Sequence, residues 1–551
     1  MNPTSRSFRT ASSILFALAV GTAGAESPDF SDTPLLSNLS FAPGSGFQLS
    51  VEGLPGEYHV VYSDDLSEWD TLSETVVAAE PVPLIDSESL GVPRRFYRIE
   101  EASLFPEYHT LLSTWGLQAE PGISSFLMGF IQPDGLFIDS EGEQVIVRRP
   151  ADAFASTSIH FDGSVDVSGE YGLQSTRFAI PTIFAGGGIT LNIPGDDEES
   201  DPSWELPMKP LGAIAPADGT ANMLTGTSIR HATYDGGERF EFVQAFMARK
   251  SVDAGIDDLT GDWGIVRLEI EGDSEEILYT VLSAPVTISD EDGGTFALNG
   301  IEIETEMRHF FDGSDPERRY FEPTEIDFAF PIQVNPNGEV VLSIEGFGRP
   351  GQDVQHLAGF ISPDANFLTL AEGWPSVYDA RNEMVPEGAC NGFAAHQLFL
   401  GVRRDPNPDL AGKEYRLEGQ SFWVSRWDFE MLPSGPDGIA GGLSFDQNGE
   451  ATLTLEDLIV RLPFYDGDQG GIIVETEDPD EIPLSYTIAP DGRLNFDMSD
   501  LTDPGDEAFF TGFAQEGGRA LILGLGFAGQ NDEGGDEGQI SMWVATCVNC
   551  D

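Results

Sequence analysis

The chain has 551 residues, of which 94 are acidic and only 27 are basic, so its formal net charge is −67 at pH 7. The electrostatic field of so negative a protein repels nucleic-acid phosphates and anionic lipid headgroups, so nucleic acid is not expected as a partner. Hydrophobic residues make up 40% of the sequence, which supplies packed cores and excludes a wholly disordered chain. The acidity favours adaptation to salt or solubility, because salt screens the self-repulsion of the chain.

Residues 1–25 have the pattern of a secretory signal peptide. Arg6 and Arg9 give a positive start, an apolar run follows, and Ala-Gly-Ala at 23–25 provides the small residues of a cleavage site. The apolar run is too short to cross a bilayer, and charged residues or glycines interrupt every later one. We therefore expect a secreted protein without a membrane span, extracellular or at the cell surface, with the periplasm as the alternative.

Residues 41–100 form the first predicted module, a small β-sandwich. They contain Tyr-Ser-Asp-Asp-Leu-Ser-Glu-Trp at 62–69, then Asp86, then Arg-Phe-Tyr-Arg at 95–98. These elements resemble a module that recurs in secreted modular proteins of aquatic bacteria, and that module is similar to a fibronectin type III or immunoglobulin-like sandwich. The resemblance implies an accessory unit. Its large core side chains are expected to be Tyr62, Trp69, Phe96 and Tyr97.

Short segments rich in β-branched residues follow along the chain, and turn signals separate them. Glycine after Asn or Asp supplies the positive φ of tight hairpin turns. Such pairs occur at 134–135, 162–163, 218–219, 292–293, 337–338, 448–449 and 491–492. After the signal peptide, only residues 103–115 have a pattern compatible with a longer helix. The predicted fold class is all-β.

From residue 107 on, the sequence is internally repeated with a period near 150 residues. Trp115 and Trp263 are 148 residues apart, and two Gly-Phe pairs, at 359–360 and 512–513, are 153 apart. We predict three antiparallel β-units, each a barrel or a sandwich, at residues 107–250, 258–404 and 409–550.

A closed barrel would remove the exposed strand edges of such a unit. Leu-Thr-Gly-Asp-Trp at 259–263 resembles the opening Gly-x-Trp strand of lipocalin-like or avidin-like barrels. The resemblance implies that Trp263 plugs one barrel end, and it transfers no ligand-binding residue.

Catalytic motifs are missing from the sequence. It has no Gly-x-Ser-x-Gly nucleophile turn and no histidine pair with the spacing of a zinc site. Cys390 and His396 lie near each other in the sequence, but a buried thiol or a disulfide is the favoured role for Cys390. We expect one structural disulfide, either between Cys547 and Cys550 or from one of them to Cys390.

Acidic loops are numerous, and calcium is the cation that converging carboxylates favour. Asp290 and Asp292 are the best candidates for calcium ligands, with a solvated loop as the alternative. Residues 289–296 are also similar to a sialidase-type Asp box, which implies a structural turn; Glu291 and Phe296 depart from that pattern. No other cofactor is expected.

We therefore predict a non-enzymatic modular β protein that binds or scaffolds outside the cell, with an extracellular glycan or protein as partner. One alternative is a glycan-binding or glycan-active protein. Trp423 and Trp427, which project from one face of a strand, would form its sugar-stacking platform. A second alternative is a carrier of a small apolar ligand inside a β-barrel.

Overall fold

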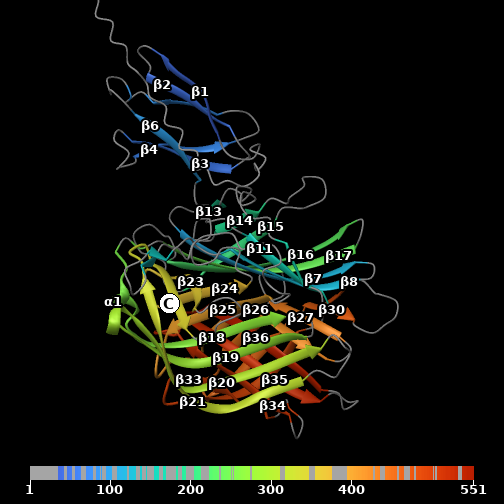
Figure 1. The fold of residues 1–551 in the computed structure, drawn as a ribbon. Coiled ribbons are helices and arrows are strands. Elements are labelled where there is room, and N and C mark those ends of the chain that lie inside the picture. Colours follow the sequence, from blue (N-terminus) through green and yellow to red (C-terminus); the bar gives the residue numbers. More distant parts are fainter. Residues whose placement is uncertain are drawn as a thin grey trace, which may run out of the picture. The chain divides into compact units, whose positions relative to one another are not determined.

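A computed structural model gives the fold of the protein (Figure 1). Its described residues lie between 35 and 550; the gaps of ten residues or more are 169–181, 194–203, 212–221 and 375–393. The predicted signal peptide lies outside them. The described elements are almost all strands, which confirms the all-β prediction. Two short helical turns, α1 (Ile256–Leu259) and η3 (Glu291–Gly293), flank strands of the middle region.

The chain divides into two compact units that adjoin in sequence at residues 106 and 107. The N-terminal unit has two three-stranded antiparallel sheets. One contains β1 (Leu35–Ala42), β2 (Gly46–Glu52) and β5 (Val82–Asp86), and the other contains β4 (Asp70–Val77), β3 (Gly56–Ser63) and β6 (Phe96–Glu101). Phe47 and Leu49 of the first sheet are buried together with Val60 of the second. The two sheets therefore face each other as a small sandwich.

Residues of the N-terminal motif meet in a polar network around Asp86, which is only 1% exposed. Its carboxylate accepts hydrogen bonds from Arg95 Nη1 at 3.0 Å and from the Tyr97 hydroxyl at 2.7 Å. The Arg95 guanidinium also lies 4.0 Å from the centre of the Tyr62 ring. Burial and the Asp86 carboxylate raise the pKa of Tyr97, so its hydroxyl remains a donor at neutral pH. The motif thus links the two sheets through the hydrogen bond between Asp86 of β5 and Tyr97 of β6. The remaining motif residue, Trp69, lies outside the described residues.

The second unit begins with a nine-stranded antiparallel sheet. Its strand order is β12 (Val165–Ser168), β11 (Phe154–His160), β8 (Ile123–Ile131), β7 (Tyr108–Glu120), β17 (Gly237–Arg249), β16 (Met223–Tyr234), β15 (Trp204–Pro210), β14 (Ile189–Ile193) and β13 (Thr182–Ile183). A separate hairpin joins β9 (Phe137–Ile138) to β10 (Gln144–Val145). The helix considered for 103–115 is wrong. On β7 the buried side chains include Leu111, Trp115 and Leu117, and this period of two is that of a strand.

The first closed barrel follows. Each strand pairs with the next, and the last pairs back with the first, in the order β18 (Gly261–Gly272), β19 (Glu276–Ser289), β20 (Thr295–Phe310), β21 (Glu317–Val334), β22 (Glu339–Glu345), β23 (Val354–Ile361), β24 (Phe367–Trp374) and β25 (Ala394–Arg403). Trp263 is fully buried in the lumen of this barrel, and its Nε1 donates to the Leu259 carbonyl at 2.7 Å. Arg403 lies 5.2 Å from the centre of the Trp263 ring.

A second eight-stranded barrel closes because β26 pairs with both β28 and β36. Its strands are β26 (Glu414–Val424), β28 (Gly441–Phe445), β29 (Glu450–Leu455), β32 (Asp480–Ile488), β33 (Arg493–Phe496), β34 (Glu507–Ala514), β35 (Ala520–Gln530) and β36 (Asp536–Cys547). Three more strands extend the sheet from β26, namely β27 (Asp428–Ser434), β30 (Leu458–Pro463) and β31 (Ile473–Thr476).

The two barrels share one strand plan, because each runs up and down around its ring in chain order. A Cβ on Gly359 would collide with the Thr369 carbonyl of the next strand, and a Cβ on Gly512 would collide with the Ile522 carbonyl. These glycines are therefore required at the same place in the hairpins β23–β24 and β34–β35. In all three consecutive sheets the first strand pairs antiparallel with the last: β7 with β17, β18 with β25, and β26 with β36.

Among the described residues of the second unit, three large apolar clusters are found. Each barrel lumen contains one. The third lies between the outer walls of the two barrels and one face of the nine-stranded sheet, and it includes Trp115, Val266, Tyr279, Phe422 and Phe513. Packing thus uses the apolar part of each lumen and the outer faces in the third cluster, whereas β31 and most of β32 are exposed.

Candidate functional site

The lumen of the first barrel has two chemically different ends. One end is filled by apolar side chains around Trp263 and Phe296. At the other end, alternate residues of β18, β19 and β20 place charges in the lumen, because their neighbours Ile303, Thr305 and Met307 face outward and are buried. We call this group the lumen charge cluster, which consists of Arg267, Glu269, Glu271, Glu276, Glu302, Glu304, Glu306 and Arg308.

Arg267 is the centre of the cluster. Its Nη1 lies 3.3 Å from Glu269 Oε2 and its Nη2 lies 3.0 Å from Glu304 Oε1. Burial by itself would lower the pKa of Arg267, but the surrounding carboxylates outweigh burial and raise it. The side chains of Arg267 and Glu304 keep 21% and 24% of their surface exposed, so solvent reaches this end of the lumen.

Arg308 forms the second pair of contacts, with Nε 2.7 Å from Glu306 Oε1 and Nη1 3.2 Å from Glu276 Oε1. Carboxylates still outnumber guanidiniums in the cluster. Burial raises the pKa of Glu304 to about 6; Arg267 opposes this shift, whereas Glu302 adds to it. Burial likewise raises the pKa of Glu302, against the influence of Arg267. A third arginine, Arg319 of β21, also lies 3.7 Å from Glu306 Oε1, so three guanidiniums contact the carboxylates of this cluster.

Sequence reasoning missed this cluster. The signal is the alternation of acidic and apolar residues in Ile-Glu-Ile-Glu-Thr-Glu-Met-Arg at 301–308. In a barrel wall such alternation means that one face is apolar and the other charged. The sequence alone does not say which face points into the lumen, because here the apolar face is the outer one.

A serine–histidine pair lies outside the barrel lumen, where β7 meets β25. Ser113 Oγ lies 2.7 Å from His396 Nε2, and the Trp115 ring lies edge-on to the imidazole at 4.4 Å between ring centres. Both partners are buried, at 0% and 1% exposure, and burial lowers the pKa of His396 to about 3. A neutral base would suit a nucleophile, but no substrate can reach this one. The pair fastens the nine-stranded sheet to the first barrel.

Asp290 is exposed and precedes the single turn η3, on which Asp292 lies. Within the described part of the chain, no group of three or more His, Cys, Asp or Glu side chains is placed to hold a metal ion. Calcium binding at these two residues stays a prediction.

Trp423 of β26 is half-buried and stacks on Phe527, with ring centres 5.6 Å apart and an angle of 20° between the planes. Trp427 lies outside the described residues. The structure therefore places one of the two proposed platform residues, and that residue already has an aromatic partner on its face.

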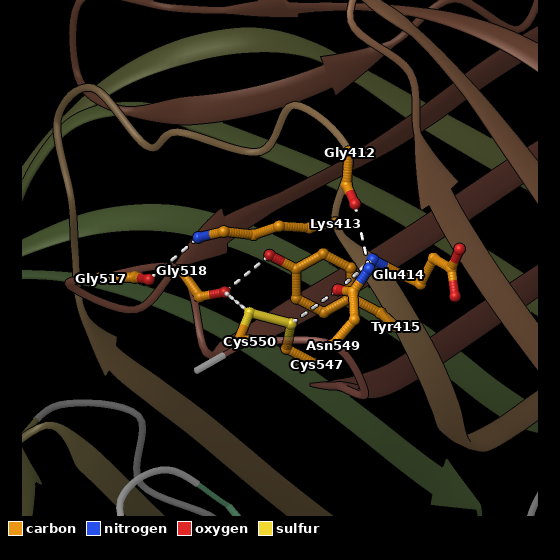
Figure 2. The surroundings of a disulfide bond; sticks show 9 residues. All are labelled: Gly412, Lys413, Glu414, Tyr415, Gly517, Gly518, Cys547, Asn549 and Cys550. Carbon is orange, nitrogen blue, oxygen red and sulfur yellow. Dashed lines mark hydrogen bonds between the residues drawn. A yellow bond between two sulfur atoms is a disulfide. The ribbon is translucent and has the colours of Figure 1, made fainter.

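Cys547 and Cys550 are joined by a disulfide at the end of β36 (Figure 2). The loop that it closes contacts the start of β26: Asn549 Nδ2 donates to the Gly412 carbonyl at 3.0 Å, and Asn549 Oδ1 accepts from Glu414 N at 3.0 Å. Tyr415 donates to the Gly518 carbonyl at 2.7 Å beside it. The disulfide loop thus fastens the last strand to the first at the edge of the barrel. Cys390 lies outside the described residues.

No protein-family model matches the sequence, and no curated protein is similar to it. Solved structures of transferrin-binding protein B show a distant likeness. A double mutant from Haemophilus parasuis is 10% identical over 93% of this chain and 86% of that chain, with a TM-score of 0.19. The protein from Neisseria meningitidis is 10% identical over 90% and 84%, with a TM-score of 0.16. Scores this low carry no argument about function. Across the described residues, no helix has the length and apolar character to span a bilayer.

Proposed function

We propose that the protein is an exported, non-enzymatic binding protein that acts at the cell surface or outside the cell. The observation that carries this proposal is the lumen charge cluster, a partly exposed group of charges at one end of a barrel whose other end is filled by apolar side chains. Placing this many charged side chains inside a barrel costs desolvation free energy even when they form ion pairs, and an apolar lumen would serve a scaffold as well. A binding site explains its presence.

The remaining organisation belongs to the same proposal. Residues 41–100 would be an accessory module of the fibronectin type III or immunoglobulin-like kind, supported by the Asp86 network. The units at 107–250, 258–404 and 409–550 would be three copies of one β-unit, supported by the pairing of first with last strands. A signal peptide at 1–25 would export the chain.

Labelling of intact cells tests the location. An antibody against the second barrel should stain unpermeabilised cells or detect the protein in the medium. Staining that appears only after the cells have been permeabilised would contradict the proposal.

A reactive serine probe tests the absence of catalysis at the one described serine–histidine pair. A fluorophosphonate should leave Ser113 unmodified in the folded protein, because both partners are buried. A known serine hydrolase, which must become labelled, serves as the control for probe quality, and the heat-denatured protein should remain unlabelled. Stoichiometric labelling of Ser113 in the folded protein would contradict the non-enzymatic assignment.

A further inference from the structure

We infer that β21 binds an extended, basic segment of a partner protein along its free edge, the side of residues 324–330 that faces away from β20. The inference goes beyond the proposed function, because it concerns the edge of a strand and not the lumen charge cluster. Its starting point is the short seam between β21 and β22. These strands pair only over residues 332–334 of β21, although β21 begins at Glu317. A strand edge without a neighbour offers unpaired backbone groups to an incoming chain.

Pro331 explains where the seam stops. Ile332 N donates to the Gly294 carbonyl at 3.1 Å, so the even-numbered residues before it direct their backbone groups toward β20. The odd-numbered residues from 325 to 329 therefore direct theirs to the free edge. Pro331 continues this odd-numbered series but has no N–H, so it cannot donate a ladder hydrogen bond to β22. Among the described strands, none pairs with the free edge.

Side chains on both faces of this segment are exposed. On the outer face these are Glu325, Asp327 and Ala329. On the lumen face Phe330 is 9% exposed, whereas Phe328 is 49% exposed. An exposed aromatic ring on a lumen face is expected where the neighbouring strand is missing. An added strand would place a side chain beside Phe328 and cover part of its ring.

The charges on the outer face select the partner. Glu325 and Asp327 pair in register with Ile301 and Asn299 of β20, so no cation lies directly across the ladder from them. Lysine or arginine at alternate positions of an added strand would lie opposite these acids, where opposite charges stabilise paired strands. A second copy of the chain would bring the same acids to the edge, and like charges directly opposite are destabilising. A basic segment of another protein therefore fits the edge better than a second copy does.

The probe for the test is the labelled peptide acetyl-Val-Thr-Val-Lys-Val-Lys-Val-amide, which we call the basic peptide. Its length matches the segment 324–330, which Pro323 and Pro331 bracket. In an antiparallel pairing its two lysines lie opposite Asp327 and Glu325, and their backbone N–H groups face β21. Fluorescence polarisation with the full chain at physiological ionic strength should show saturable binding at one site per chain.

Backbone methylation of the peptide separates strand addition from attraction between charges. Methyl groups on the backbone nitrogens of both lysines remove the N–H donors that would face β21, but they keep both positive charges. The methylated peptide should bind at least about tenfold more weakly than the basic peptide. Equal binding of the two peptides would mean that charge alone attracts them, and it would overturn the inference.

Charge reversal on the chain tests the position of the site. Glu325→Lys with Asp327→Lys should weaken binding of the basic peptide by at least about tenfold. The same variant should gain binding of an acidic counterpart, in which glutamates replace both lysines, and misfolding cannot produce such a gain. Asp480→Lys with Glu481→Lys is the matched control, because it makes the same charge change at exposed positions of β32. Equal weakening by the two double variants would overturn the inference.

Sedimentation velocity distinguishes the peptide from a second copy of the chain. A dimer that dissociates when the basic peptide is added would show that a second copy occupies the free edge, and it would overturn the inference. Failure of the basic peptide to bind would overturn it as well. Either result leaves the proposed function standing, because that proposal depends on the lumen charge cluster.

Discussion

Glu304 shows how one lumen residue links stability to pH. Burial raises its folded-state pKa to about 6, above its ordinary value of 4.5. The folded state therefore binds this proton more tightly than the unfolded state does. The carboxylate opposes folding above about pH 6, and this cost disappears as the pH falls below 4.5.

Glu304→Gln should therefore stabilise the protein at pH 7 by about 1–2 kcal/mol, because it removes the ionised form that burial disfavours. At pH 4 the difference should vanish, since Glu304 is then largely protonated in both states. Urea denaturation of the two proteins at both pH values measures this. A variant less stable at pH 7 would mean that the ion pair with Arg267 outweighs burial.

Residue-level prediction from the sequence succeeded where the chemistry is local. Asn-Gly and Asp-Gly pairs predicted turns with positive φ, and Gly293, Gly338, Gly449 and Gly492 have φ between +78° and +95°. It failed at the lumen charge cluster, because the chain has 94 acidic residues and only the barrel register selects those that face inward. The Ser113–His396 pair could not be predicted from the sequence either, since 283 positions separate the partners.

Glycines on the outer wall of the second barrel let the first barrel approach. A Cβ on Gly524 would lie 3.1 Å from Val266 Cγ1, and a Cβ on Gly526 would lie 2.6 Å from Thr305 Cβ. A Cβ on Gly538 would collide with Met307 Sδ. Strands β35 and β36 thus carry sockets for side chains of β18 and β20.

Gly526→Ala should lower stability by about 1–3 kcal/mol, because Thr305 and Phe509 both lie 2.6 Å from the added Cβ. Gly442→Ala is the matched control in β28, where the nearest atoms are 3.8 Å away. Thermal melting compares the two variants with the parent. Equal melting temperatures for both variants would show that the barrels do not meet through this socket.

At the scale of whole elements, the sequence predicts which segments are strands and where the hairpins turn. It does not predict which sheets close into barrels. The sequence left barrel and sandwich as alternatives for each β-unit. Two units close because β25 pairs with β18 and β36 pairs with β26, and such pairing joins residues more than a hundred positions apart. The pattern of residues 103–115 is compatible with a helix as well as a strand, because the adjacent Leu111 and Leu112 obscure the alternation of β7.

The whole molecule carries a net charge of −67, and its self-repulsion opposes the compact state. Raising sodium chloride from 10 mM to 1 M shortens the screening length from about 30 Å to about 3 Å. The melting temperature should therefore rise markedly across this range. Chloride is the proper anion for the test, since sulfate would also strengthen apolar burial. A flat melting temperature would remove the argument for salt adaptation.

Antiparallel pairing of the first strand of a barrel with its last has a consequence for how such a chain can be lengthened by duplication. In the first barrel, Trp263 pairs with Arg403, so the polypeptide enters and leaves the ring at one point. A segment with adjoining ends can be duplicated in tandem, or its termini relocated by circular permutation, without rethreading its neighbours. The lengthening of this protein by whole rings would then need only a short connector such as 404–413 for each added copy.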